Sequence, residues 1–297
     1  MGAETQDRAK QAKKGFLLVF VAALLLSLGG VCIKQIPWQP LSINSFRAII
    51  ALVVLIPFAK VTGAPFRLTP GVLIGAASVW GATTLFTIAT KLTTAGNAVL
   101  LQFTAPIFVI LLMWLFFREK PRRLDLIACL CVCGGVVCFF LDSLGSGRLT
   151  GDIVAVFSGV CYAGVFMMQR LPGANPIWAT VLGQAMGAAV GLPSLVQETQ
   201  FTSSALFFGV VLGLLQVGLA YALLTLGLKY AKPITASLVA GIEPVLNPVL
   251  VALVVGETLS PLALVGGAVV FLSVRVYNLL CLRLEQREKA AAPVATE

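Results

Sequence analysis

The stretch LLQFTAPIFVILLMWLFFRE (Leu100–Glu119) has a counterpart in LVAGIEPVLNPVLVALVVGE (Leu238–Glu257). Both are apolar runs of helix length with a proline near the start and a glutamate at the end. They lie 138 positions apart. The same offset aligns Gly75 with Gly213, Thr87 with Thr225, Lys91 with Lys229, Ala98 with Ala236 and Leu124 with Leu262. These matches indicate an internal duplication, so whatever the protein does, it does with two related halves.

The composition predicts a membrane protein. Of the 297 residues, 59% are hydrophobic and 11% are charged, whereas soluble domains carry about 25% charged residues. Apolar runs of about 20 residues, each long enough to cross a bilayer, recur along the chain. Lipid offers backbone amides no hydrogen-bond partner, so continuous runs of this kind must form helices. We therefore expect an all-α integral membrane protein.

Ten transmembrane helices are expected, five in each half. Because five is odd, the second half enters the membrane from the opposite side, and the two repeats are inverted around a central cavity. We divide the chain into a tail (1–14), repeat 1 (15–141), repeat 2 (151–282) and a second tail (283–297). The expected spans are 16–35, 41–60, 70–90, 95–117, 123–141, 151–169, 176–195, 204–226, 232–255 and 261–281.

The positive charges indicate orientation. The net charge of +9 comes from short loops and tails, so topology explains it better than a nucleic-acid partner. With both termini in the cytoplasm, the outer loops keep only Lys34, Lys91 and Arg148. The first run, Phe16–Ile33, follows a basic start but is too long for a signal peptide, and we interpret it as a retained helix. The expected location is the inner (plasma) membrane.

Chemistry that needs a metal, a cofactor or a nucleophile has little support. The chain has no histidine, and its seven cysteines lie in or beside apolar runs, where thiols behave as small apolar groups. Cys129 and Cys133 share a helix face but have too few neighbouring ligands for zinc. We expect no catalytic residues, no metal and no cofactor, so a membrane-embedded enzyme is the less favoured alternative.

Three stretches resemble a known family: SFRAIIALVVLIPF around Arg47, GNAVLLQFTAPIFVILLMWLFFREK, and ITASLVAGIEPVLNPVLVALVVGETLSPLALVGG. Together with the doubled five-helix plan, they look like the two EamA-type domains of the drug/metabolite transporter superfamily. The resemblance covers Phe16 to Cys281. It implies a ten-helix secondary transporter, often an exporter of amino acids or other metabolites, with spans 5 and 10 at the periphery. It does not transfer a substrate, and a lipid-linked sugar flippase remains an alternative.

Polar residues on several spans are candidates for lining the cavity. Thr83 and Thr87 share one face of span 3 and align by the 138 offset with Tyr221 and Thr225 of span 8. Lining a cavity is one interpretation, and bonding to the carbonyl four residues earlier in the same helix is the other. The candidate cavity residues are Trp80, Thr83, Thr87, Gln102, Tyr162, Gln216, Tyr221, Thr225, Glu243 and Asn247.

Glu243 is the most informative candidate, because repeat 1 has Ala105 at the matching position. A carboxylate inside the membrane is costly and usually faces a pathway or a partner. Burial favours its neutral form, so it could exchange a proton or bind a substrate amine. Alternatively it pairs statically with Arg275 or Arg47, or lies near the span end that begins at Lys232.

Several other residues have architectural interpretations. Pro106, Pro244 and Pro248 each remove a helix hydrogen bond and predict a kink, which serves either as a gating hinge or as static shape. Glu119 and Glu257 end their spans and suggest packing or capping. Arg47 and Lys34 could attract an anion, but snorkelling to the membrane surface is favoured. The sequence leaves monomer and homodimer open, because the closely spaced glycines suit packing within the chain or between copies.

The leading prediction is a secondary transporter that moves a small polar or amphipathic metabolite, such as an amino acid, by alternating access and in the outward direction. Its expected partners are the small-molecule substrate and the lipid bilayer.

Overall fold

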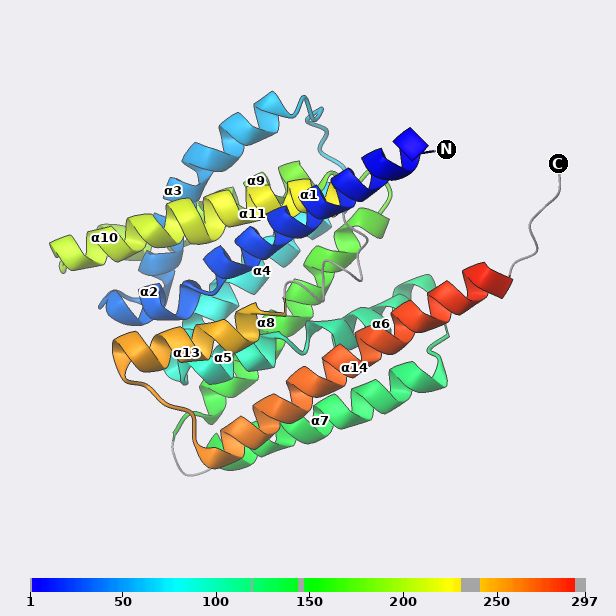
Figure 1. The fold of residues 1–297 in the computed structure, drawn as a ribbon. Helices are drawn as coiled ribbons and strands as arrows, with labels where there is room; N and C mark the ends of the chain where they lie inside the picture. Colours follow the sequence, from blue (N-terminus) through cyan, green and yellow to red (C-terminus); the bar gives the residue numbers. More distant parts are fainter. Residues whose placement is uncertain (1, 119, 144–146, 231–240, 292–297) are drawn as a thin grey trace.

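The computed structural model describes residues 2–118, 120–143, 147–230 and 241–291, and every regular element in these ranges is helical (Figure 1). The first half contains α1 (Gly2–Leu26), α2 (Gly29–Gln35), α3 (Pro40–Val61), α4 (Pro70–Leu92), α5 (Ala95–Gln102), α6 (Ala105–Phe117) and α7 (Arg123–Ser143). The second half contains α8 (Leu149–Met167), η1 (Met168–Arg170), α9 (Pro176–Val196), α10 (Ser203–Val211), η2 (Leu212–Leu219), α11 (Ala220–Tyr230), α13 (Glu243–Val255) and α14 (Pro261–Ala291).

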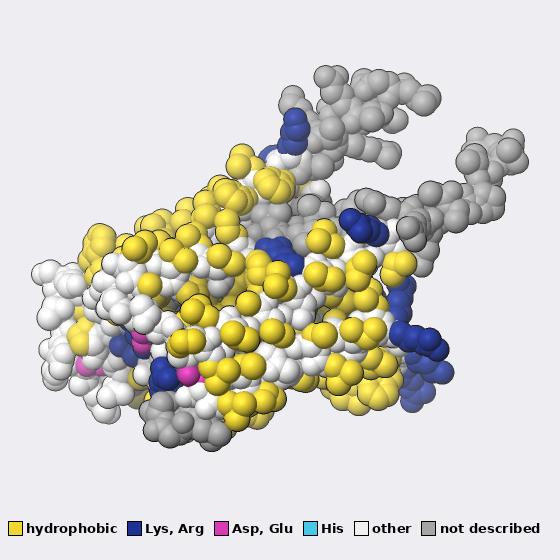
Figure 2. Space-filling model, turned by 60° about the horizontal axis from the view of Figure 1, so that its bottom comes forward, with side chains coloured by type: hydrophobic (Ala, Val, Ile, Leu, Met, Phe, Trp, Pro, Cys, Tyr) yellow, Lys and Arg dark blue, Asp and Glu magenta, His cyan; other side chains and the backbone are white. Residues whose placement is uncertain are grey.

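Nine stretches of the described chain are long and apolar enough to cross a membrane. They match nine of the expected spans, with their ends shifted by a few residues. The remaining span is represented by α13, an apolar helix of 13 residues, and its expected start at 232 lies outside the described residues. Apolar side chains cover much of the face seen in Figure 2. Many large apolar residues are exposed, for example Leu115 (70%) and Leu253 (77%). Water would not tolerate so much apolar surface, and the protein is an all-α integral membrane protein.

Polar residues directly before the first helical residue cap several helices. The Thr69 hydroxyl accepts a hydrogen bond from the Val72 amide (3.2 Å), and the Asn175 side chain accepts one from the Trp178 amide (3.4 Å). In α4 and α9 a proline follows directly as the first helical residue, where its missing N–H would have had no helical partner. These local signals set the span ends that the sequence predicts.

The last helix of each half lies at one side of the molecule. The helices α7 and α14 pack against each other (Figure 1), and only 22% and 24% of their apolar windows are buried, the lowest values among the nine spans. Gly135 and Gly266 face each other, since a Cβ on Gly266 would lie 2.7 Å from the Gly135 carbonyl oxygen. The peripheral placement implied by the family resemblance is therefore observed.

The closely spaced glycines of α9 and η2 also pack within the chain. A Cβ on Gly183 would lie 2.7 Å from the Ala76 carbonyl oxygen, and one on Gly213 would lie 2.7 Å from the Arg47 carbonyl oxygen. Gly191 likewise lies against Leu41. These glycines therefore pack within the chain, where they bring α9 close to α3 and α4 and η2 close to α3.

Pro106 and Pro244 lie at helix starts rather than at kinks. Helix α5 ends at Gln102 and α6 begins at Ala105, so this span of repeat 1 is interrupted at 103–104. In repeat 2, α13 begins after a turn at Gly241 and Ile242, and residues 231–240 lie outside the described ranges. Under the 138 offset the two turns and the two helix starts coincide. Pro106 and Pro244 are each the second residue of the new helix, where proline is well tolerated. The expected kink inside a continuous helix is therefore wrong at Pro106 and Pro244, and of the three prolines expected to kink a helix, Pro248 lies inside one.

Two further spans depart from a plain α-helix. Span 1 is interrupted at Ser27 and Leu28, between α1 and α2. Span 8 contains the eight-residue π-helix η2, and such wide turns are often found at functional sites. No proline lies at Ser27–Leu28 or within η2, so the sequence predicts ordinary α-helices at both places. Both lie beside the cavity described next.

Candidate functional site

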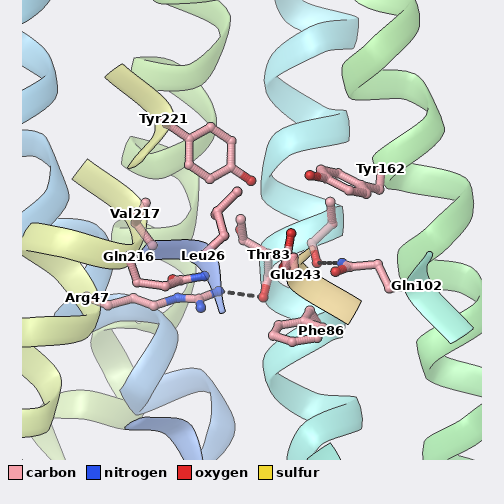
Figure 3. Close-up of a pocket in the computed structure, with 11 residues that line it drawn as sticks. Leu26, Arg47, Thr83, Phe86, Gln102, Tyr162, Gln216, Val217, Tyr221 and Glu243 are labelled. Atoms are coloured by element: carbon pink, nitrogen blue, oxygen red, sulfur yellow. Dashed lines mark hydrogen bonds between the residues drawn. The ribbon is translucent and has the colours of Figure 1, made fainter. Parts of the chain in front are cut away.

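A small cavity lies between the two halves (Figure 3). Its free volume is about 30 Å³, enough for about one water molecule. The residues that line it come from eight elements of both repeats: Leu26 (α1), Arg47 (α3), Ala82, Thr83 and Phe86 (α4), Gln102 (α5), Tyr162 (α8), Gln216 and Val217 (η2), Tyr221 (α11) and Glu243 (α13).

Arg47 is the cationic side of the cavity, and the expectation that it snorkels to the surface is wrong. It is 1% exposed. Its Nη2 donates to Asn44 Oδ1 (2.8 Å) and to the Thr83 carbonyl oxygen (2.6 Å), and its Nε donates to Asn44 Oδ1 (3.2 Å). Asn44 is itself held by donating to Thr84 Oγ1 (3.0 Å). These acceptors stabilise a guanidinium in the interior, where it would otherwise be too costly.

Glu243 is the acidic side of the cavity. It is the first residue of α13 and is 8% exposed, so it lies at the positive end of the helix dipole. Within the described part of the chain, no hydrogen bond or ion pair joins its carboxylate to Arg47 or Arg275. The Arg275 guanidinium lies over the Phe271 ring and against Gly241. The alternative of a static ion pair is therefore not observed, and Lys232 lies outside the described residues.

Amides and phenols supply the remaining polar surface. Gln102 Nε2 donates to Ser158 Oγ (2.5 Å), and Ser158 Oγ donates to the Ala82 carbonyl oxygen (2.9 Å). Gln216 Oε1 is buried without a hydrogen-bond partner among the described residues. The Tyr162 and Tyr221 rings lie on opposite sides of the cavity, from α8 and α11 (Figure 3).

Six of the ten candidate residues line the cavity: Thr83, Gln102, Tyr162, Gln216, Tyr221 and Glu243. Four do not: Trp80, Thr87, Thr225 and Asn247. The hydroxyls of Thr87 and Thr225 donate to the carbonyls of Thr83 (2.9 Å) and Tyr221 (2.7 Å), four residues earlier in their own helices. Thr83 also bonds within its helix, to Val79 (2.9 Å). Of these aligned residues, Thr83 and Tyr221 line the cavity, whereas Thr87 and Thr225 bond within their own helices. Each of the two interpretations is therefore correct for part of the set.

A polar cluster closes one end of the molecule, opposite the end where α1 begins and α14 finishes (Figure 1). Lys34 Nζ donates to Glu257 Oε1 (2.8 Å) and to the Thr93 carbonyl oxygen (2.8 Å). Glu257 Oε2 accepts from the Ala95 amide (2.9 Å) at the start of α5. Lys34 therefore pairs rather than snorkels, and Glu257 caps α5 as expected. We call the Lys34–Glu257 pair the latch; Glu119, its counterpart in repeat 1, lies outside the described residues.

A second hollow, of about 250 Å³, lies beside the latch and is lined mainly by apolar residues of α13 and the following segment, with Thr94 and Gly96 of the first half. It shares no lining residue with the central cavity.

Comparison with known proteins assigns the family. A model of the EamA-like transporter family matches residues 13–141 and again residues 149–279, once in each half. The chain belongs to the EamA-like transporter family. An uncharacterized transporter of Archaeoglobus fulgidus is 26% identical to it over 268 residues, which is 88% of this chain and 95% of that protein.

The threonine/homoserine exporter RhtA of Escherichia coli is 28% identical over 243 residues, covering 77% of this chain and 78% of that protein. A crystal structure aligns with a TM-score of 0.64 at 19% identity, covering 91% of this chain and 98% of that chain, and this likeness shows the fold alone. The EamA-like protein is therefore a multi-pass membrane transporter and not an enzyme.

The sequence missed five lining residues of this EamA-like transporter. Leu26, Ala82, Phe86 and Val217 look like any apolar residue of a span, and nothing in their type distinguishes a cavity wall from a lipid contact. Arg47 did carry a signal, because a charge seven residues after the start of a span, with an asparagine one turn earlier, is deep enough to face inward.

Proposed function

We propose that this EamA-like protein is a secondary transporter of amino acids or closely related small metabolites, which it moves by alternating access through the central cavity. The observation that supports this most is the presence of one cation, Arg47, and one carboxylate, Glu243, in a single buried cavity formed by both repeats.

A zwitterion has the chemistry that this cavity would recognise. A guanidinium binds a carboxylate through charge-assisted hydrogen bonds, and a buried carboxylate binds an ammonium group. Gln102, Gln216 and the two tyrosine hydroxyls offer further hydrogen bonds, while Leu26 and Phe86 provide an apolar wall for a short side chain. The RhtA relative is named an exporter of threonine and homoserine, which are solutes of this class.

The cavity must expand before it can hold such a solute, because its free volume is about 30 Å³. A contracted cavity with the latch closed is one stage of a cycle in which the solute site faces the two sides alternately. The turns at 103–104 and 241–242 give α6 and α13 free starting ends that can reorient.

The orientation we propose places both termini in the cytoplasm of a cell whose inner (plasma) membrane holds the protein. Helix α1 begins and α14 ends at the same end of the molecule (Figure 1). Lys and Arg gather densely at one end (Figure 2), in agreement with the positive-inside rule. The latch then faces outward, and we propose export as the direction of net transport because the RhtA relative is named an exporter.

The test is transport into proteoliposomes with a panel of labelled amino acids, with and without a pH gradient. For each transported amino acid, the panel includes the analogue without the amino group and the analogue without the carboxylate. Glu243→Gln should raise KM for the amino acid about 10- to 100-fold, the range expected for one charged hydrogen bond, and leave the analogue without the amino group unaffected.

Arg47→Gln should show the opposite selectivity. Its transport of the analogue without the amino group should fall, and its transport of the analogue without the carboxylate should stay unaffected. Glu198→Gln, in the exposed segment after α9, is the matched control and should transport normally. If both cavity variants transport every analogue like the wild type, the assignment is wrong. Loss of pH-driven flux in Glu243→Gln would add proton coupling to the same carboxylate. The flippase alternative gains no support, because the hollow beside the latch and the central cavity share no lining residue.

A further inference from the structure

One face of α13 runs from the central cavity to the latch. Glu243, Asn247, Val251 and Val255 recur at four-residue spacing, so they lie one above the other along the helix. Glu243 lines the cavity, and Glu257 forms the latch just beyond the helix end. Asn247 is one turn, about 5.4 Å, from the cavity residue along this face.

Asn247 is buried in a way that needs an explanation. It is 0% exposed, and neither Oδ1 nor Nδ2 has a hydrogen-bond partner in the described part of the chain. Its Oδ1 lies against Gly30 of α2. The preceding residue of α2, Gly29, lies against the amide of Gln216, where a Cβ would be 3.1 Å from Nε2, and Gln216 Oε1 is also unpartnered among the described residues. Buried polar groups in native proteins are nearly always paired, so unpartnered amide atoms against two consecutive residues of α2 point to a partner that comes from elsewhere.

The surroundings show that an amide is not needed to close the structure. Beyond Asn247, the contact between α2, α5 and α13 consists of Val31, Ala95 and Val251, with Leu250 and Val255 packed against them. A leucine at position 247 would continue this apolar seal without an orphaned polar group. The repeat-1 positions that correspond to 247, 251 and 255 are Val109, Met113 and Phe117, so the matching face of α6 is apolar throughout.

We propose that Asn247, together with Gln216, is a second binding subsite for the polar groups of the transported solute, on its route between the central cavity and the latch. The side-chain amide can donate to a carboxylate and accept from an ammonium group, so it suits the zwitterion assigned to the cavity. The subsite is occupied when the contact between α2 and α13 opens, and this inference rests on the transporter function proposed above.

The first test separates a route residue from a packing residue. Asn247→Leu should unfold at the same or a higher temperature than the wild type, because it removes an unpartnered amide. Solute binding to the cavity, measured by thermal shift in detergent, should stay within about twofold, while the transport rate in proteoliposomes should fall about tenfold or more. Asn247→Gln should retain much of the transport, since it keeps the amide.

The matched control is Gln184→Leu. Gln184 is 1% exposed and its Nε2 is also unpartnered among the described residues, but it lies on α9, away from this face. It should transport like the wild type. The proposal is overturned if Asn247→Leu transports normally, if Gln184→Leu loses as much transport, or if Asn247→Leu and Asn247→Gln lose stability and transport together.

A second test does not depend on knowing the solute. Asn247→Cys and Val245→Cys are treated in proteoliposomes with a charged, membrane-impermeant maleimide, and modification at each position is read by mass spectrometry. Val245 lies on the same helix, is 48% exposed and lines neither the central cavity nor the hollow beside the latch, so it should face lipid and stay unmodified. Position 247 should be modified, and faster when the latch is weakened by Glu257→Gln. No modification of Asn247→Cys in either background overturns the route, even if transport itself is confirmed. Modification in a protein that carries no amino acid would instead retain the route and reject the proposed solute.

Discussion

Helix α6 in repeat 1 and helix α13 in repeat 2 match in backbone but not in chemistry. A turn at the matching positions 103–104 and 241–242 precedes each helix, and proline is the second residue of both. Both also end in a left-handed residue at matching positions, Arg118 (φ 55°) and Gly256 (φ 76°). The duplication has therefore preserved the turn, the helix start and the helix end.

The side chains around the two turns differ in polarity and size. Repeat 2 has Gly241 at the turn and Glu243 at the helix start, where repeat 1 has Phe103 and Ala105. Arg275, which lies against Gly241, corresponds to Val137, a residue 51% exposed on α7. The turn before the helix is therefore common to both halves, while a carboxylate at the helix start is found in the second half alone.

The largest effect on stability should come from placing a glutamate at the start of α6, as in α13. Ala105 is 1% exposed and does not line the cavity, so Ala105→Glu buries a carboxylate without a partner. We expect a loss of about 3 kcal/mol in stability, seen as poor expression and early thermal unfolding in detergent. Ala105→Leu controls for side-chain size. Wild-type stability in Ala105→Glu would show that the two helix starts are chemically equivalent after all.

A smaller loss should follow from filling the glycine at the turn before α13. A Cβ on Gly241 would collide with the Arg275 guanidinium, so Gly241→Ala should cost about 1–3 kcal/mol by overpacking and displace Arg275. Gly134→Ala is the control, because a Cβ there meets nothing within 4 Å. Since Gly241 and Arg275 touch, the double variant Gly241→Ala with Arg275→Gln should lose less than the sum of the single losses. Strict additivity would indicate that the contact does not matter.

The features that the two halves share could be predicted from the sequence. The predictions were wrong where the backbone departs from a regular helix. Span number, class and peripheral helices follow from apolar runs and the 138 offset, because those depend on length and composition alone. The break before Pro106 was not predicted, since proline is compatible with either a kink or a new helix start. The inward turn of Arg47 was missed because it depends on acceptors from two helices, Asn44 and the Thr83 carbonyl, and such tertiary contacts are not written in a local pattern.

The polar residues of α4 and α11 show that sequence alone does not separate cavity residues from residues bonded to their own helix. Thr83 and Tyr221 occupy matching positions and both line the cavity, while Thr87 and Thr225 also match but bond to their own helices. Thr83→Val and Tyr221→Phe should each raise KM about 3- to 10-fold, the effect of one lost neutral hydrogen bond. Thr87→Val and Thr225→Val should transport within about twofold of the wild type in the same proteoliposome assay. Equal losses at all four positions would place the cavity wall one turn further along α4 and α11.

The smallest effect on stability should come from the ends of α6 and α13. Repeat 1 has a residue with a side chain, Arg118, in the left-handed region, where repeat 2 has Gly256. A side chain in the left-handed region costs about 1–2 kcal/mol, and glycine escapes this at an entropic cost of about 0.5–1 kcal/mol. Arg118→Gly should therefore raise stability by about 0.5–1 kcal/mol. Gly256→Ala should lower it by a similar amount through φ alone, because nothing lies within 4 Å of the added Cβ. Arg118→Ala removes the charge but keeps the Cβ, so it should show no gain in thermal unfolding. If Arg118→Ala gains as much as Arg118→Gly, the difference between the two ends is one of charge and not of backbone.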